Sequence, residues 1–203
     1  EWHYRNDGSY ELGTAEGGRK IFLMGMNYLN EYKSSREALN TYYLKTIHHE
    51  FTHILHQTVE FSTAYQFITT DYKVDKCFNR EFADFLSRGF ITDYAQKNYH
   101  EDFAEMVSTY VTSTADEWEA LLKKASYAPV KDKDGNLVYD SNGLVVADTK
   151  TKANGRDLIE QKLSIMRSYM QDQWGIDIDE LRASILQREN DVVNGKVDLK
   201  NLD

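Results

Sequence analysis

The sequence predicts an α+β protein that is mainly helical and contains a small sheet. Apolar residues recur at helical spacing over most of the chain, and several of these stretches begin at residues that cap helices. One apolar run, 19–27, has the length of a strand and is bounded by turn residues. With 203 residues, the chain is long enough for one domain with a sizeable core. We expect a core over 1–126, a hairpin insertion over 127–152 and C-terminal helices over 153–203.

The N-terminal part is expected to combine the small sheet with the first long helix. Residues 1–18 are polar and rich in glycine, which indicates a loop with a short strand near 10–12. Ser34-x-x-Glu37 has the form of a capping box and predicts a helix that continues to about Gln57.

The rest of the chain alternates helical segments with loops. A helix is expected over 80–87, followed by a break at Gly89. Asn98-x-x-Glu101 also has the form of a capping box and predicts a second long helix. The remaining expected elements are a helix from Ser113 or Thr114 to about Ala125, a tight-turned hairpin over 130–148, and helices from about Gly155 and over 178–186.

Composition limits the classes of partner. A net charge of −9 makes binding to nucleic acid or anionic lipid by bulk charge unfavourable. Cys77 is the only cysteine, so no disulfide forms within the chain and cysteine usage does not identify a compartment. No apolar run approaches membrane-spanning length. The chain begins at Glu1 rather than Met, so we expect a processed or truncated N-terminus, with any lipid anchor outside this sequence.

The first long helix carries a metal-binding pattern, His49-Glu50-x-x-His53. Residues four apart lie on one face of a helix, so the two imidazoles can hold one metal ion. Glu50 lies on an apolar stripe, where a carboxylate is costly unless it faces water or a metal ion. It can serve as the general base for a water on the metal. The stripe consists of Leu39, Tyr43, Ile47, Glu50 and Ile54.

The third ligand decides the class of site, because catalytic zinc usually takes three protein ligands and a water. Metzincins need a glycine and a further histidine where this chain has His56 and Val59, so that class is excluded. The inverted order H-x-x-E-H is also absent. A glutamate from a later helix remains, and Glu101 is the candidate.

The segment that contains Glu101 supports this choice. Ala104 is small enough to let its helix pack closely, and Glu105, one turn on, would orient a zinc histidine through its other ring nitrogen. Two alternatives stay open. Glu101 can act only as the capping partner of Asn98. Asp102 can compete as the ligand, although it points away from the face that Glu101 and Glu105 share.

Tyr94 stands seven residues before Glu101, and a tyrosine hydroxyl near the metal could stabilise an oxyanion. By spacing alone, an ordinary core tyrosine is the favoured interpretation in a chain with 14 tyrosines. The neighbouring histidines differ in helical phase from the motif pair, so we interpret them as packing or surface residues. They are His48, His56 and His100.

The run from Tyr94 to Glu105 resembles the Tyr-x6-Glu-x-Phe-Ala-Glu segment of the anthrax-lethal-factor-like metallopeptidases, which are gluzincins. The resemblance implies that Tyr94 assists the oxyanion and that Glu101 binds zinc. Over roughly 7–175 the chain resembles the substrate import-associated zinc metallohydrolase lipoproteins of Bacteroidetes. The residues that carry it are 7–18, the strand ending at Asn27, the metal-motif helix and the Glu-Asp-Phe-Ala-Glu helix.

This resemblance implies a zincin-like metallopeptidase fold with zinc as cofactor. It also implies an outer-membrane lipoprotein, periplasmic or at the cell surface, with glycan-uptake machinery as a possible partner. The lipobox cysteine is absent from the sequence, so the anchor follows from the resemblance only.

Three functions compete at this point. The first is a zinc peptidase in which Glu50 deprotonates the attacking water and Tyr94 helps to polarise the carbonyl of a peptide or protein substrate. The second is a catalytically idle zincin-fold module that binds peptide or glycan for an importer, and intact Glu50 argues against it. The third, a mucin-directed glycopeptidase, expects an interval shorter than the 48 residues from His53 to Glu101.

Overall fold

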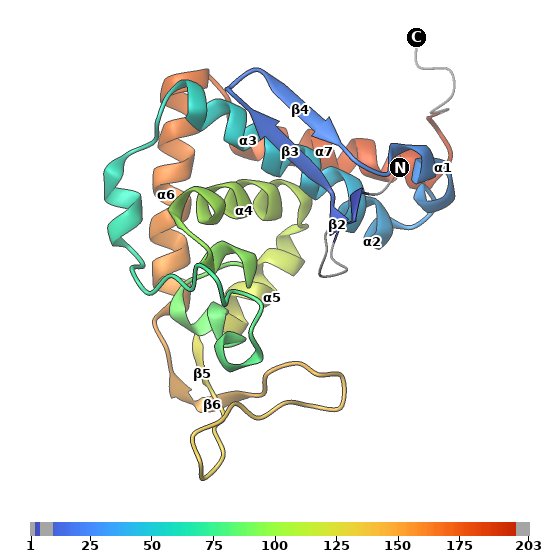
Figure 1. The fold of residues 1–203 in the computed structure, drawn as a ribbon. Helices are drawn as coiled ribbons and strands as arrows, with labels where there is room; N and C mark the ends of the chain where they lie inside the picture. The colour runs from blue at the N-terminus through green and yellow to red at the C-terminus, as the bar shows by residue number, and fades with distance from the viewer. Residues whose placement is uncertain (1–2, 5–9, 198–203) are drawn as a thin grey trace. The chain divides into compact units, whose positions relative to one another are not determined.

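The computed structural model describes residues 3–4 and 10–197, and it divides into two compact units. The first unit consists of Glu1–Glu60, Val107–Ser113 and Met170–Asp203, and the second of Phe61–Met106 and Thr114–Tyr169. The described residues form three two-stranded antiparallel sheets and a larger number of helices, joined by loops (Figure 1). The predicted α+β class is therefore confirmed.

In the first unit a short hairpin lies along the metal-motif helix. Strand β3 (Gly13–Glu16) pairs with β4 (Lys20–Leu23), and both contact α3 (Lys45–Thr58) (Figure 1). The turn between the strands uses positive φ angles of 57° at Gly17 and 65° at Gly18, which only glycine adopts readily. The strand predicted over 19–27 is confirmed but shorter, because a 3₁₀ turn, Met26–Tyr28, follows it.

A second strand pair precedes this hairpin, β1 (His3–Tyr4) with β2 (Tyr10–Glu11). The strand expected near 10–12 therefore exists, although Leu12 lies between β2 and β3. Residues 7–9, which begin the glycine-rich segment quoted above, lie outside the described residues.

The helical run before the metal motif is continuous from α2 (Arg36–Leu39) through a π-helical turn (Asn40–Leu44) into α3, and the short α1 (Leu29–Tyr32) precedes it. The N-cap is Ser35 and not Ser34, because the Ser35 hydroxyl accepts a hydrogen bond from the Ala38 N–H at 3.2 Å. Helix α7 (Ile178–Val193) also belongs to this unit, and the Arg36 Nε donates to Glu189 Oε2 at 2.9 Å.

In the second unit the predicted helix over 80–87 is wrong, because two 3₁₀ helices, Arg80–Phe82 and Phe85–Arg88, stand there. Two side chains bind carbonyl groups of this segment, that of Arg88 at its end and that of the distant Tyr139. Arg88 Nη2 donates to the Phe82 carbonyl at 3.1 Å, and the Tyr139 hydroxyl donates to the Arg80 carbonyl. Carbonyl groups used in this way favour short turns over a regular α-helix.

The longer helices of the second unit begin where their caps predict. Helix α4 (Tyr99–Thr112) starts in this unit, and Asn98 Oδ1 accepts from the backbone of His100 and Glu101 at 3.0 Å each. Helix α5 (Ala115–Ala125) follows the predicted start at Thr114, which forms a capping box with Glu117. Helix α6 (Gly155–Trp174) also begins here, at the predicted residue.

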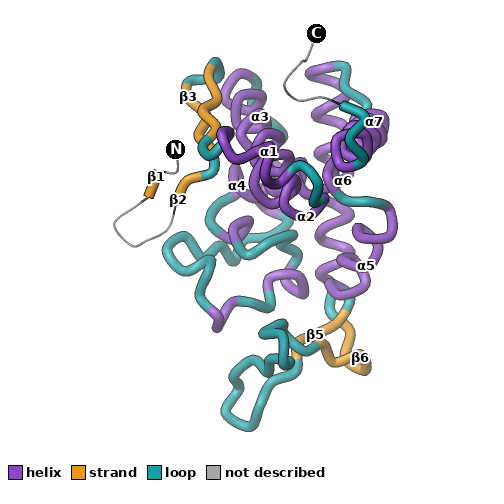
Figure 2. Tube along the Cα trace, turned by 90° about the vertical axis from the view of Figure 1, so that its right-hand side faces the viewer, coloured by secondary structure: helices purple, strands orange, loops and turns teal. Residues whose placement is uncertain are grey.

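An extension joins α5 to α6 (Figure 2). Strands β5 (Tyr127–Pro129) and β6 (Ala147–Lys152) pair at its base, and two tight turns follow in the loops between them. Gly135 and Gly143 take positive φ angles of 85° and 76° in these turns. The hairpin predicted over 130–148 is therefore confirmed, and the strands at its base extend it by a few residues at each end.

A buried ion pair holds the N-terminal turn of α4. Lys162 Nζ lies 2.6 Å from Asp102 Oδ2 and donates to the Gly89 carbonyl at 2.7 Å, and the Tyr72 hydroxyl donates to Asp102 Oδ2 at 3.1 Å. Both charged side chains are fully buried. Burial raises the pKa of the Asp102 carboxyl and lowers the pKa of the Lys162 ammonium, so each charge depends on the other.

Among residues 3–4 and 10–197, we find no helix with the length and apolar character needed to cross a membrane.

Candidate metal centre

The two motif histidines lie one above the other on α3. Their Nε2 atoms are 3.0 Å apart, and the rings meet edge to face with centroids 4.7 Å apart. Tetrahedral zinc with bonds of about 2.0–2.1 Å separates two nitrogen ligands by about 3.3 Å. The observed pair of His49 and His53 therefore fits a zinc ion with only a small adjustment of the side chains.

His56 supports this pair in a way that the sequence analysis missed. Its Nε2 lies 2.7 Å from the Nδ1 of His53, on the side of the ring opposite the nitrogen that faces His49. If His53 uses Nε2 for a metal, Nδ1 carries the proton and donates it to His56. The spacing of three residues was the available sign of this contact. His48 behaves as expected, because burial lowers its pKa to about 4 and keeps it neutral.

Glu50 is buried on α3, and strand β3 comes unusually close to it. A Cβ added to Gly13 would lie 2.8 Å from Glu50 Cγ, 2.9 Å from Thr46 Cγ2 and 3.1 Å from the Phe22 carbonyl. Real Cβ atoms essentially never show contacts under 3.0 Å, as the first two of these would be. Because Gly13 has no side chain, β3 can approach α3 closely at the position of Glu50.

The second unit brings Tyr94 and Glu101 together. The Tyr94 hydroxyl donates to Glu101 Oε1 at 3.1 Å, and Lys97 Nζ lies 2.9 Å from both oxygen atoms. Burial, followed by the negative charge of Glu101, raises the pKa of Tyr94 to about 12. Tyr94 is therefore a proton-bearing hydrogen-bond donor at neutral pH.

Lys97 is a second residue that the sequence analysis missed. Burial opposes its charge, but its hydrogen bonds to Tyr94 and Glu101 outweigh that effect and raise its pKa above the ordinary value for lysine. Lys97 precedes α4 and stands four residues before Glu101 in its first turn, a spacing typical of helical ion pairs. The pair supports the view that Glu101 is held as a carboxylate.

The alternative ligand Asp102 is excluded by its surroundings. Its carboxyl is fully buried against Lys162, as described above. Glu105 lies one turn after Glu101, and its Oε2 accepts a hydrogen bond from the Thr92 hydroxyl at 2.7 Å. Its role toward a zinc histidine stays a prediction. The structure thus places His49, Glu50 and His53 on α3 of the first unit, and Tyr94, Glu101 and Glu105 in the second.

Comparison with known proteins agrees with this chemistry. A family described as "Putative zinc-binding metallo-peptidase" matches residues 2–179. A solved crystal structure of "a putative zinc-binding metallo-peptidase" from Bacteroides caccae ATCC 43185 is 32% identical to this chain and superposes with a TM-score of 0.70. The match covers 98% of this chain and 65% of that one, so this chain spans less than two thirds of its length. A comparison with curated proteins gave no match. The chain belongs to this family of zinc-binding metallopeptidases.

Proposed function

We propose that this chain is a zinc-dependent peptidase that holds its metal through His49, His53 and Glu101. The observation that supports this most is the pair of imidazole Nε2 atoms, 3.0 Å apart on the helix that also carries Glu50. Zinc, when bound, lowers the pKa of a coordinated water to about 7 and polarises a carbonyl.

Glu50 is the general base and acid of the proposed reaction. Its carboxylate accepts a proton from the attacking water and then gives that proton to the leaving amine. Gly13 leaves room for this side chain between β3 and α3. Tyr94 keeps its proton because its pKa is raised to about 12. Its hydroxyl donates to Glu101 Oε1 in this structure, and in the proposed reaction it would turn that single O–H to the oxygen on which negative charge develops.

The zinc ligands can be tested by metal content. We expect the wild type to retain one zinc per chain after dialysis, and Glu101→Ala to bind zinc more weakly by more than about 100-fold. Even partners that only orient a zinc ligand contribute about 10–100-fold to affinity. Inductively coupled plasma mass spectrometry gives the stoichiometry, and competition with a chromogenic chelator gives the affinity.

Glu180→Ala is the matched control, because Glu180 is exposed and occupies the first turn of α7 as Glu101 occupies the first turn of α4. Both substitutions remove a carboxylate near a helix N-terminus, but only the loss of Glu101 is expected to release zinc. Full zinc content and wild-type affinity in Glu101→Ala would show that the third ligand is another residue.

A second prediction concerns the approach of β3 to Glu50. In Gly13→Ala the new methyl group would lie 2.8 Å from Glu50 Cγ, so the carboxylate has to move. We expect kcat to fall by up to about 100-fold, because a displacement of about 1 Å can cost that much. Zinc content should stay unchanged, since Glu50 is not a ligand. Thr14→Ala, in the same strand, is the control, and wild-type kcat in Gly13→Ala would contradict this role of Gly13.

The cellular setting rests on the family resemblance alone. We propose an outer-membrane lipoprotein whose anchor lies outside this sequence, and which acts on peptide or protein near glycan-uptake machinery. Labelling with a radioactive fatty acid and fractionation of the full-length protein would test the anchor. Label absent from a protein found wholly in a soluble fraction would contradict it.

A further inference from the structure

The side chain of Phe78 is largely exposed to solvent, but its ring is held in one position. It is 68% exposed, yet its ring stacks on that of Tyr94 with centroids 5.7 Å apart and planes 13° apart. Burial of the ring in the protein core therefore contributes little. The ring lies instead against the ring of Tyr94, the residue whose hydroxyl the proposed mechanism directs at the substrate.

A buried amide fixes the two backbone segments that carry this stack. Gln96, which is fully buried, donates through Nε2 to the carbonyl of Cys77 and to the carbonyl of Asp93, at 3.1 Å each. These carbonyls belong to the residues that directly precede Phe78 and Tyr94. Gln96 thus joins the two segments next to the residues whose rings stack.

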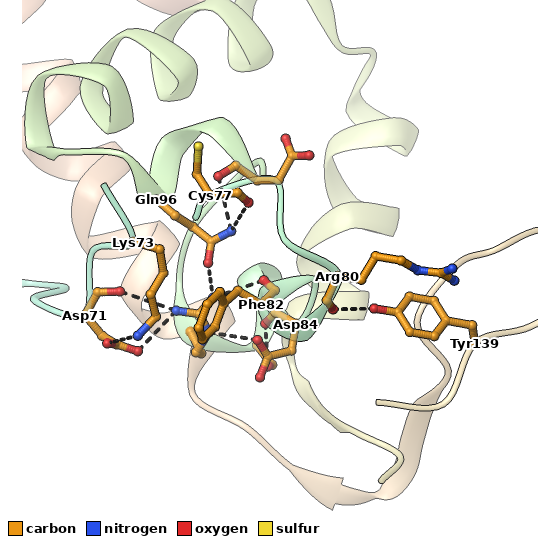
Figure 3. A network of polar contacts seen from close by, with 11 residues as sticks. Asp71, Lys73, Cys77, Arg80, Phe82, Asp84, Gln96 and Tyr139 are labelled. Atoms are coloured by element: carbon orange, nitrogen blue, oxygen red, sulfur yellow. Dashed lines mark hydrogen bonds and ion pairs between the residues drawn. The ribbon is translucent and has the colours of Figure 1, made fainter. Parts of the chain in front are cut away.

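Further contacts hold Gln96 and the surrounding loop (Figure 3). The Gln96 carbonyl accepts from the backbone N–H of Lys73 at 2.6 Å, and its side-chain oxygen accepts from Arg88 Nη2. Arg88 also bonds to Asp84 at 2.9 Å and to Asp71 at 3.2 Å. Such a network keeps an exposed ring in one place, and this lowers the entropy cost of binding against it.

We propose that Phe78 determines specificity, by forming one wall of a subsite for a large apolar side chain of the peptide substrate. This inference rests on the proposed peptidase function and on Tyr94 in its oxyanion role. An extended peptide advances about 3.3 Å per residue. A side chain one or two residues from the carbonyl at the Tyr94 hydroxyl therefore reaches the neighbouring ring, where aromatic or aliphatic groups gain contact area.

Hydrolysis of paired peptides measures this preference. The probes are internally quenched octapeptides in which each position in turn is Phe or Ala, and the measured quantity is the ratio of kcat/KM within each pair. We expect the wild type to favour Phe by about 10–100-fold at one position, the range typical of apolar pockets. Phe78→Ala should bring that ratio close to one, and Phe78→Leu should restore part of it.

Phe67→Ala is the matched control. Phe67 is 71% exposed and belongs to the same unit, but it lies in the 3₁₀ helix Thr63–Phe67, whereas Phe78 lies in a turn. Among the described residues, no ring stack of Phe67 with Tyr94 is found. It should keep the wild-type ratio. If Phe78→Ala lowers kcat/KM equally for both members of every pair, Phe78 only supports Tyr94 and the inference is wrong.

A binding measurement separates this inference from the peptidase proposal. Zinc-free protein in chelator is titrated with the same octapeptides, and affinity is followed by fluorescence anisotropy. We expect the peptide with the preferred Phe to bind about 10-fold more tightly to wild type than to Phe78→Ala, and the Ala peptide to show a smaller difference. If no form hydrolyses peptide but this difference persists, the peptidase proposal fails and the apolar subsite stands. Equal affinities in wild type for every pair would overturn the subsite.

Discussion

Glu50→Gln should lower kcat by about 10²–10⁴-fold while zinc stays bound. The substitution keeps the shape of the side chain but removes the proton acceptor, and general base catalysis typically contributes an effect of this size. Zinc is expected to stay because His49, His53 and Glu101 are the proposed ligands. Single-turnover hydrolysis of a peptide that the wild type cleaves gives the rate, and metal analysis of the same sample gives the zinc content.

Glu37→Gln provides the control, since Glu37 is exposed in the first turn of α2 and undergoes the same chemical change. It should retain the wild-type rate. Equal rates for wild type and Glu50→Gln would show that the proposed mechanism is wrong, even with zinc at the proposed ligands. A catalytically idle binding module predicts a different outcome, in which neither form hydrolyses peptide and ligand affinity survives the substitution.

Lys162→Met should lower the free energy of unfolding by about 3–5 kcal/mol, the usual cost of breaking one side of a buried ion pair. The substitution leaves the fully buried Asp102 without its cation and removes the donor to the Gly89 carbonyl. Urea unfolding followed by circular dichroism measures the loss. Lys123→Met, at an exposed position of α5, should change stability by less than about 0.5 kcal/mol.

The double variant Asp102→Asn/Lys162→Met tests whether the lone charge is the cause. It removes both charges, so it should be more stable than Lys162→Met alone. With Asp102→Asn measured as the second single variant, the coupling between the sites is the stability change of the double variant minus the sum of the changes in the two single variants. If Lys162→Met and the double variant unfold at the same urea concentration, the loss comes from packing and not from the unpaired carboxylate.

The stability loss should also depend on pH. Burial raises the pKa of Asp102 in the folded protein, so the folded state binds this proton more tightly than the unfolded state does. In Lys162→Met, the stability from this group is therefore present below the unfolded aspartate pKa of about 4 and is lost as pH rises through the higher folded pKa. The difference from wild type should be largest near pH 7 and smaller near pH 4. A difference independent of pH would contradict this explanation.

Local spacing was enough to predict the parts of the site that lie within one helix. His49 and His53 meet because residues four apart share a face of α3, and a contact of this kind needs no distant residue. The starts of α4 and α5 follow equally from Asn98 and Thr114, whose side chains bind the backbone of the next turn. The ion pair of Lys97 with Glu101 was also visible in principle, because its spacing is local.

Contacts between distant residues were not predictable in the same way. Nothing near Gly13 in the sequence indicates that a Cβ there would collide with Glu50, since the contact depends on how β3 lies on α3. The same holds for Lys162, which is 60 residues from Asp102, and for Tyr139, which is 59 residues from the Arg80 carbonyl to which it donates. Two further statements stay predictions: that the chain forms a single domain, and that Glu105 orients a zinc histidine.

The sequence by itself therefore determined the pairing of His49 with His53 and the starts of α4 and α5, because each depends on contacts within about one helical turn. Only the tertiary structure decided which carboxylates are available. Asp102 is neutralised by a buried lysine, Glu101 is held by Tyr94 and Lys97, and Glu50 lies where a glycine leaves room. The physical reason is that burial and long-range charge, which set the state of a carboxylate, arise only when the chain is packed.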